Sequence, residues 1–336
     1  IKMERNIPMR DGVKLFTAIY LPKEKNQKYP FLLNRTPYTV SPYGEGNYKT
    51  SLGPSPGLLK EGFIFVYQDV RGKWMSEGEF VDVRPHVKNK KGKKDIDENS
   101  DTYDTIEWLL KNVKPNNGKV GMYGISYPGF YATTSLPDAH PALKAVSPQA
   151  PVTDWFIGDD FHHNGALFLA DAFNFYSTFG VPRPKPITPD KGPKSFQYPI
   201  KDNYRFFLDL GAVKNANKKH FGDSIKFWND LMANGNYNEF WKARNITPHL
   251  QKVKPAVLVV GGFFDAEDTY GTLKTYKAIE TQNPSATNNL VMGPWFHGGW
   301  VRSTGEQFGH IEFGQPTSAW YQKHIEYPFF MHYLKE

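Results

Sequence analysis

The sequence predicts a large α/β domain built on a parallel sheet and interrupted by a helical insertion, and three observations lead to this prediction. Short apolar runs alternate along the chain with segments of helical periodicity, as they do when helices cover a parallel sheet. The chain has 336 residues, of which 39% are hydrophobic and 15% aromatic, enough for a sizeable core. The alternation stops between about residues 151 and 250, where we expect the insertion.

Six apolar runs are predicted to be strands, because strands that are buried on both faces are almost continuously apolar. They are Phe31–Asn34, Phe63–Gln68, Val120–Tyr123, Lys144–Ser147, Ala256–Val260 and Leu290–Met292. Two segments between them carry an apolar stripe at helical spacing and are predicted to be helices: Thr102–Val113 and Thr269–Ile279.

The insertion divides the predicted domain into three parts. Residues 1–150 form the first part of the core, 151–250 a helical cap, and 251–336 the second part of the core. The cap segment contains an aromatic stretch from Trp155 to Phe179, a proline-rich linker, and helical pieces around Trp228 and Trp241. No internal repeat is present.

A serine lies between a predicted strand and a predicted helix in Lys119-Val-Gly-Met-Tyr-Gly-Ile-Ser-Tyr-Pro-Gly129. Flanking glycines allow the close backbone approach of a nucleophile elbow, which exposes the serine Oγ above the sheet. Pro128 suits the first turn of the following helix, although the usual elbow has its glycine at that position and here it is Gly129. The pattern predicts Ser126 as a nucleophile, with an ordinary Gly/Ser turn as the alternative.

A serine nucleophile needs a base and an acid that orients the base. In folds with this elbow the order along the chain is Ser, then Asp or Glu, then His, at the ends of strands. Asp265 follows the strand Ala256–Val260, and His297 follows Leu290–Met292. Taken alone, Asp265 could cap a helix and His297 could fill a loop. Together with Ser126 in the right order, they predict a catalytic triad.

The tetrahedral intermediate of acyl transfer also needs hydrogen-bond donors for its oxyanion. The backbone N–H of Tyr127, the residue after the nucleophile, is the first candidate. The loop after Phe31–Asn34 contains no glycine-rich donor motif, but the hydroxyl of Tyr38 could serve as the second donor.

Composition excludes several other classes. No run approaches the roughly 20 apolar residues that span a bilayer, so we expect no membrane partner. The net charge is +7, and the lysines of His86–Lys94 lack interleaved aromatic residues, so this segment is interpreted as a solvated loop rather than a nucleic-acid site. The absence of cysteine excludes disulfides and thiol chemistry. The start at Ile1, without Met or a signal peptide, suggests a mature or trimmed product.

These segments together resemble the α-amino acid ester hydrolases and amino-acid-ester acyltransferases, in the group that includes cocaine esterase, glutaryl-cephalosporin acylases and X-prolyl dipeptidyl peptidases. The matching motifs are Met9-Arg-Asp-Gly-Val13, Arg35-Thr-Pro-Tyr38, Gln68-Asp-Val-Arg-Gly72 with Ser76-Glu-Gly78, Gly118–Gly129, Gly158-Asp-Asp-Phe-His162, Gly262-Phe-Phe-Asp-Ala-Glu-Asp268 and Gly293-Pro-Trp-Phe-His297. The resemblance implies an α/β-hydrolase fold, the triad above and Tyr38 as oxyanion donor, and it accounts for the shifted glycine. It also implies that Met9–Gly12 leads into the sheet as a strand and that Asp69–Glu77 is a loop near the site.

Amino acid ester hydrolases hold the α-ammonium of the substrate with a carboxylate cluster, and the matching positions here are Asp160, Glu267 and Asp268. Converging carboxylates repel one another and are stabilised by an incoming ammonium. The alternative is that Glu267 and Asp268 favour a helix N-terminus and Asp160 is a cap. A metal site at Asp159, Asp160, His162 and His163 is not predicted, because adjacent histidines rarely converge on one ion.

The expected function is that of a serine esterase and acyltransferase, which passes an α-aminoacyl group from an ester to water or to an acceptor amine, with no cofactor. The alternatives are a less selective carboxylesterase, a β-lactam-antibiotic acylase, or a catalytically silent ligand-binding scaffold. The resemblance suggests a periplasmic or secreted protein, allows for a homo-oligomer, and implies a C-terminal jelly-roll domain that would begin near Glu336.

Overall fold

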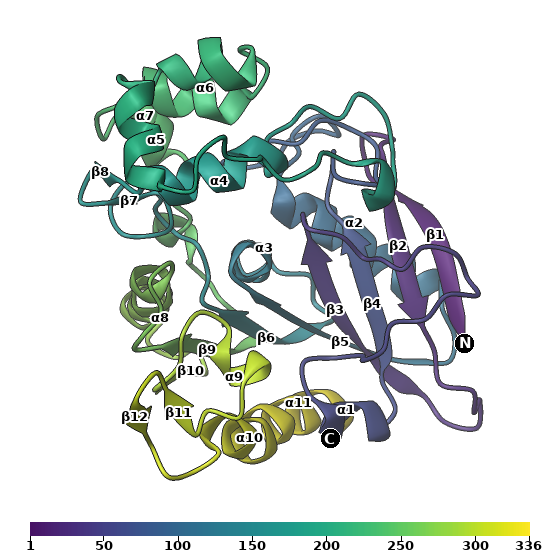
Figure 1. Ribbon diagram of the computed structural model, residues 1–336. Helices are drawn as coiled ribbons and strands as arrows, with labels where there is room; N and C mark the ends of the chain where they lie inside the picture. The colour runs from purple at the N-terminus through teal and green to yellow at the C-terminus, as the bar shows by residue number, and fades with distance from the viewer.

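The computed structural model describes residues 1–336, and its centre is one eight-stranded sheet with the order β1-β2-β4-β3-β5-β6-β9-β10 (Figure 1). Neighbouring strands from β4 to β10 are parallel, whereas β1 pairs with β2, and β2 with β4, antiparallel. The strands are β1 (Lys2–Pro8), β2 (Lys14–Tyr20), β3 (Tyr29–Thr36), β4 (Ile64–Asp69), β5 (Asn116–Ile125), β6 (Leu143–Gln149), β9 (Ala256–Gly262) and β10 (Asn288–Gly293).

All six predicted strands lie in this sheet, as β3, β4, β5, β6, β9 and β10. The prediction for Met9–Gly12 was wrong, because this segment is the turn between β1 and β2. Met9 N donates to Val13 O at 2.8 Å, and Gly12 has φ 91°, a conformation that glycine adopts at low cost. The two strands on either side of this turn were not predicted.

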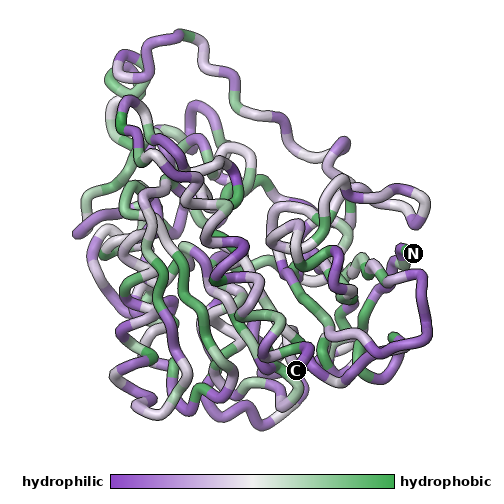
Figure 2. The backbone as a smooth tube through the Cα atoms, turned by 90° about the horizontal axis from the view of Figure 1, so that it is seen from below, coloured by the Kyte–Doolittle hydropathy of each residue, from purple (hydrophilic) through white to green (hydrophobic).

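Helices cover both faces of the sheet. The side chains of successive strand residues alternate between the faces: Phe31 and Leu33 belong to a core cluster that contains residues of α2, α3 and α8, whereas Leu32 belongs to a second cluster with residues of α11. The helices of the sheet domain are α1 (Pro56–Lys60), α2 (Glu98–Asn112), α3 (Tyr127–Thr134), α8 (Thr269–Gln282), α9 (Gly299–Arg302), α10 (Thr317–Tyr321), the π-helical turn η4 (Gln322–Glu326) and α11 (Tyr327–Lys335). Figure 2 shows hydrophobic stretches along the central strands and hydrophilic residues in the outer loops.

The predicted helices are α2 and α8, and α2 begins earlier than Thr102. Asp97 caps it: its side chain accepts a hydrogen bond from Ser100 N at 2.8 Å, while Ser100 Oγ accepts one from Asp97 N at 2.9 Å. This reciprocal capping box satisfies free N–H groups at the helix start. The first turn of α2 consists of polar residues, so the spacing of apolar residues did not indicate where the helix begins.

The chain between β6 and β9 adds no strand to the large sheet. It contains the hairpin β7 (His162–His163) and β8 (Ala166–Leu167), the helices α4 (Leu169–Phe179), α5 (Asn203–Leu210), α6 (Lys226–Ala233) and α7 (Glu239–Lys242), and the turns η1 (Pro189–Lys191), η2 (Asn217–Phe221) and η3 (Thr247–His249). A second small hairpin, β11 (Gln307–Phe308) and β12 (Ile311–Glu312), follows α9. The helices α4 to α7 lie at one end of the sheet (Figure 1). The boundaries at residues 151 and 250 stay a prediction.

After α4, the chain crosses back over the sheet domain (Figure 1). Arg183 Nε donates to Gly72 O at 3.0 Å, and Ile187 N donates to Trp74 O at 3.0 Å. These bonds join the inserted helices to the loop after β4, which the sequence placed near the site. No helix of the protein is both long enough and apolar enough to cross a bilayer.

Candidate active site

Ser126 stands at the sharp turn between β5 and α3. Its φ of 68° and ψ of −127° are unusual for a residue with a Cβ, and such conformations persist only where the surroundings enforce them. Its backbone N donates to Gln149 O on β6 at 2.9 Å. A Cβ added at Gly124 would lie 2.2 Å from Pro128 O, and one added at Gly129 would lie 2.5 Å from Gln149 O. The shifted glycine is therefore required by the close approach of α3 to β6.

Asp265 and His297 follow β9 and β10 and form an ion pair. His297 Nδ1 lies 2.9 Å from Asp265 Oδ2. The other oxygen, Asp265 Oδ1, accepts hydrogen bonds from the backbone N of Glu267 at 2.8 Å and of Asp268 at 3.0 Å. Burial alone would raise the pKa of Asp265. The hydrogen bond and charge of His297 and the two backbone N–H donors outweigh this effect, so the pKa lies below its usual value. Asp265 is therefore an ionised carboxylate held in one orientation.

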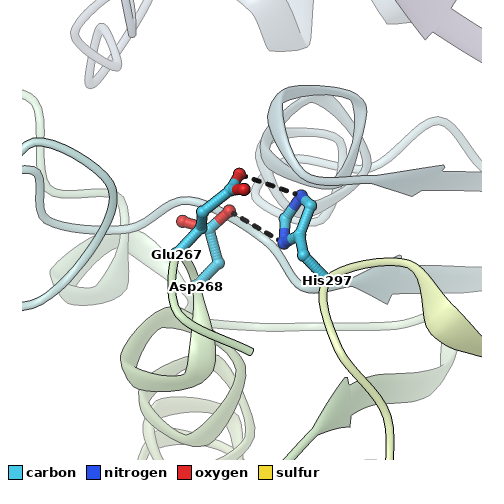
Figure 3. Close-up of side chains that lie close together, drawn as sticks. All are labelled: Glu267, Asp268 and His297. Atoms are coloured by element: carbon cyan, nitrogen blue, oxygen red, sulfur yellow. Dashed lines mark ion pairs between the residues drawn. The ribbon is translucent and has the colours of Figure 1, made fainter. Parts of the chain in front are cut away.

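The His297 imidazole is surrounded by acidic groups. Burial lowers its pKa, but the hydrogen bond and charge of Asp265, together with the charges of Glu267 and Asp160, raise it above its ordinary value. Nδ1 faces Asp265, and Nε2 lies 3.4 Å from Glu267 Oε2 (Figure 3). Ser126 and His297 line the same cavity, of about 510 Å³. No hydrogen bond joins their side chains, and catalytic hydrogen bonds often tighten only when a substrate is bound.

Tyr38 lines the same cavity from the loop after β3. Burial and the charge of Asp160 raise the pKa of its hydroxyl, while the hydroxyl of Ser126 lowers it, and the net direction is upward. The group is therefore a neutral O–H donor at ordinary pH. Its ring packs edge-on against Tyr127, with centroids 6.5 Å apart, and against Phe179 at 5.9 Å.

Tyr127 can contribute only its backbone to the site, because its side chain is used elsewhere. Its hydroxyl accepts a hydrogen bond from Val83 N at 2.7 Å and lies 3.4 Å from Asp82 Oδ1. As the first residue of α3, Tyr127 has an N–H without a partner inside the helix. This N–H and the Tyr38 hydroxyl are the two donors that the sequence predicted.

The structure also brings the three predicted ammonium-binding carboxyls together. Asp160 Oδ2 accepts a hydrogen bond from Trp155 Nε1 at 2.7 Å, and Asp160 N donates to Glu267 O at 2.9 Å. Burial, followed by the charge of Glu267, raises the pKa of Asp160 to about 7. Asp268 is fully buried, no N–H or hydroxyl group donates to its carboxyl oxygens, and burial and the charge of Asp160 raise its pKa well above the usual range, so its protonated form is favoured. Besides the imidazole, Arg302 is the cationic side chain that lines this cavity, and its charge acts to lower the pKa of Glu267.

A cation could meet several of these groups at once. Ligand atoms of Glu267, Asp268 and His297 lie within 4.8 Å of one another. His297 Nδ1 is engaged by Asp265 at 2.9 Å, so the imidazole could offer an ion only Nε2. Asp159 belongs to a turn instead: its oxygens accept hydrogen bonds from Thr153 N at 2.8 Å and Gly271 N at 2.6 Å.

Gln149 connects the elbow to the His297 loop from beneath the site. Its Oε1 accepts a hydrogen bond from Trp300 Nε1 at 2.7 Å, and its Nε2 donates to Glu326 Oε1 at 2.9 Å. Gln149 and Glu326 are fully buried. This network fixes the position of α9 relative to β6 and therefore of the loop that carries His297.

Sequence reasoning missed several residues of the cavity, chief among them Asp171 of α4 and Arg302 of α9, with Trp155, Phe161 and Phe175 as aromatic walls. Asp171 lies in the first turn of α4, where an acidic residue ordinarily indicates only a helix start. Burial raises its pKa, and the His297 charge lowers it, with a net rise. No local pattern indicates that this helix turns Asp171 toward Ser126.

Comparisons with known proteins agree with this geometry. The profile of the X-Pro dipeptidyl-peptidase (S15) family matches residues 11–299. Cocaine esterase of Rhodococcus sp. (strain MB1 Bresler) is 27% identical over 316 residues, which are 90% of this chain and 50% of that protein. The crystal structure of an aminopeptidase from the marine sediment archaeon Thaumarchaeota archaeon superposes with a TM-score of 0.89 at 33% identity, over 100% of this chain and 55% of the other. An α-amino acid ester hydrolase gives a TM-score of 0.87 at 34% identity, over 99% and 54%.

These likenesses confirm the predicted α/β-hydrolase fold. The chain spans about half the length of the relatives that it matches.

Proposed function

The chain belongs to the X-Pro dipeptidyl-peptidase (S15) family, and the proteins similar to it include esterases and a peptidase. On that basis we propose that it carries the catalytic site of a serine hydrolase that cleaves α-aminoacyl bonds. Its substrates are α-amino acid esters and related amides with a free amine. The reaction passes through an aminoacyl-enzyme, which water converts to the acid and an acceptor amine converts to a peptide or amide.

In the proposed reaction, Ser126 Oγ attacks the carbonyl carbon while His297 Nε2 takes the hydroxyl proton. Asp265 keeps the Nδ1–H of the imidazole in place through the 2.9 Å contact. The carbonyl oxygen becomes an oxyanion and receives hydrogen bonds from Tyr127 N–H and the Tyr38 hydroxyl. The intermediate then collapses, and the Nε2 proton passes to the leaving alcohol or amine. In the second half, water or an amine attacks the acyl carbon with the same base.

The observation that carries the choice of substrate is the carboxyl cluster beside His297. Asp160 and Glu267 line the cavity of Ser126, and the buried Asp268 has no hydrogen-bond donor. Buried carboxylates without partners are costly, and an ammonium ion compensates them through charge-assisted hydrogen bonds. An acyl group with a carboxylate at this position would be repelled. The same cluster would accept the N-terminal ammonium of a peptide, which agrees with the aminopeptidase among the similar structures.

The test compares kcat/KM for an amino acid methyl ester with its N-acetylated and desamino analogues. Losing one side of a buried charged contact costs about 2–5 kcal/mol, so we expect at least a tens-fold preference for the free amine. Asp160→Asn should reduce this preference. The exposed Asp209→Asn, on the surface of α5, is the matched control and should keep it. Equal rates on the free and acetylated esters in the unaltered protein would leave a general esterase, which is the alternative.

Two further measurements separate the remaining alternatives. Labelling of Ser126 by a fluorophosphonate probe, lost in His297→Ala, supports an enzyme, whereas no labelling favours a silent scaffold. Product analysis with and without an added amino acid amide then measures the share of acyl transfer. Amide product that grows with acceptor concentration supports transfer, and acid alone supports hydrolysis only.

A further inference from the structure

The nitrogen of His297 that the proposed reaction needs as a base faces a carboxylate in this structure. Nε2 lies 3.4 Å from Glu267 Oε2, while Nδ1 is held by Asp265 at 2.9 Å. Figure 3 shows the Glu267 and Asp268 carboxylates next to each other on one side of the imidazole, each facing a different ring nitrogen. Ser126 Oγ has no hydrogen bond to the ring, although both residues line the cavity.

The groups around the imidazole come from several elements, and almost all are acidic. Asp265, Glu267 and Asp268 belong to the segment between β9 and α8, Asp160 precedes β7, and Asp171 belongs to α4. Arg302 of α9 is the only cationic side chain that lines the cavity besides His297. The hydrogen bond of Asp265 and the charges of Asp265, Glu267 and Asp160 raise the pKa of His297 despite its burial. A protonated imidazole donates from both nitrogens and cannot accept the proton of Ser126.

Glu267 differs from the other acidic neighbours in its freedom to move. Its side chain is 42% exposed, whereas the side chains of Asp265 and Asp268 have no exposed surface. The carboxylate of Asp265 is also bound by two backbone N–H groups, and Asp160 is tied to Trp155 at 2.7 Å. Glu267 is therefore the member of the cluster that can exchange one cationic partner for another.

We propose that Glu267 is a competing acceptor for the Nε2–H of His297 and that an arriving α-ammonium takes over this carboxylate, so that the amine of the substrate releases the general base as well as being recognised. This inference rests on the proposed function, because it assigns a second consequence to the same bound amine. Recognition alone would change the affinity for the substrate. The exchange also changes the state of His297.

The protons balance without any further reactant. Before binding, the imidazolium donates Nδ1–H to Asp265 and forms an ion pair through Nε2 with Glu267. The substrate brings its own ammonium protons and forms hydrogen bonds with Glu267 and the neighbouring carboxyls. The Nε2 proton then leaves to solvent through the open cavity, because the ammonium has replaced the imidazolium as the positive partner. Nε2 is left with a lone pair for the proton of Ser126.

The kinetic test uses Glu267→Gln, which keeps the size of the side chain and removes its charge. The desamino ester should be turned over faster than in the unaltered protein near pH 6, by about tenfold for each unit by which the pKa of His297 falls. At a pH high enough to leave the imidazole neutral in both proteins, the two rates should converge. The amino ester should be turned over more slowly near pH 6, where its α-amine is protonated and has lost the Glu267 charge as a partner.

Asp171→Asn is the matched control for charge. It removes one carboxylate from the same cavity, but one that makes no ion pair with His297, so the desamino rate near pH 6 should rise much less than in Glu267→Gln. A Glu267→Gln variant that slows both esters at pH 6, or a rise equal to that of Asp171→Asn, would overturn the exchange. The preference of the unaltered protein for free amines would still support the proposed function in that case.

A second measurement does not depend on turnover. In Ser126→Ala, NMR of the His297 ring should show a lower pKa when phenylalanine methyl ester is bound and no change with the N-acetylated ester. An unchanged His297 titration with the bound amine would overturn the inference. The proposed function fails on a different result, which is equal rates on free and acetylated esters.

Discussion

The Tyr38 hydroxyl gives a direct test of the proposed oxyanion site, because Tyr38→Phe removes one oxygen and little else. The ring would keep its edge-on contacts with Tyr127 and Phe179, whose centroids lie 6.5 and 5.9 Å away. The backbone N of Tyr38 would still donate to Thr36 Oγ1 at 3.0 Å. Apart from the nearby hydroxyl of Ser126, the structure gives the Tyr38 hydroxyl no partner whose loss would weaken the fold.

The expected effect is large and confined to the chemical step. Loss of one oxyanion donor typically lowers kcat by about 10²–10³, or about 2.7–4 kcal/mol, while the backbone N–H of Tyr127 remains. KM should change little, because the donor acts on charge that develops in the transition state. The loss should be the same across the assay range, since burial keeps the Tyr38 pKa above it.

The assay is steady-state kinetics on an amino acid methyl ester, with thermal unfolding in parallel. Tyr198→Phe is the matched control, because it removes an exposed hydroxyl that donates to Asn174 Oδ1 at 2.6 Å, away from the reacting carbonyl. It should leave kcat unchanged. The reasoning is refuted if Tyr38→Phe keeps the unaltered kcat, or if its kcat falls only together with a large drop in Tm.

Three other predictions concern the nucleophile, a helix cap and a buried carboxyl. Ser126→Ala should abolish turnover and probe labelling with unchanged far-UV circular dichroism, and residual ester turnover would exclude the elbow serine. Asp97→Ala removes the cap of α2, including the 2.8 Å bond from Ser100 N, together with the bond from Val87 N at 3.0 Å and the ion pair with Lys90 at 2.8 Å. It should lower the unfolding free energy in urea by at least about 0.5–2 kcal/mol, the usual cost of losing a cap; no loss would show that water replaces these contacts. Burial raises the pKa of Glu326 from 4.5 to about 7, so the folded state favours the protonated acid. Stability should therefore fall as pH rises from about 4.5 to 7, by about 3 kcal/mol in all. Glu326→Gln should flatten this part of the profile of Tm against pH, and an equal slope in the variant would assign the effect to other groups.

The sequence predicted the elements whose signal is local. The strands β3, β5 and β9 are apolar runs, because helices cover both of their faces. The elbow at Ser126 is recognisable from the glycines around it, which the close approach of the backbone requires. The positions of Asp265 and His297 followed from chain order, since parallel strands end at the same edge of the sheet.

The remainder depends on contacts between distant segments. The edge strand β1 carries charged residues and lacks a continuous apolar run, whereas β2 has a buried, mostly apolar run from Leu15 to Tyr20 that the analysis overlooked. The turn at Met9–Gly12 was taken for a strand. Asp171 reaches the cavity only because α4 packs above it. The direction in which the Glu267 carboxylate points is set by the imidazole that it faces at 3.4 Å, and no spacing in the sequence encodes it.

The buried Asp268 lowers the stability of the folded protein while it contributes to the proposed selectivity for substrates with a free amine. Burial of a carboxyl with no exposed surface disfavours its charged form in the empty site, whereas a bound cation stabilises that charged form. A selection for thermal stability alone would therefore favour neutral residues at this position. The selected variants would have a higher melting temperature and a weaker preference for esters with a free α-amine. Small ammonium ions added to the unaltered protein should have the opposite character, raising its melting temperature without any change of sequence.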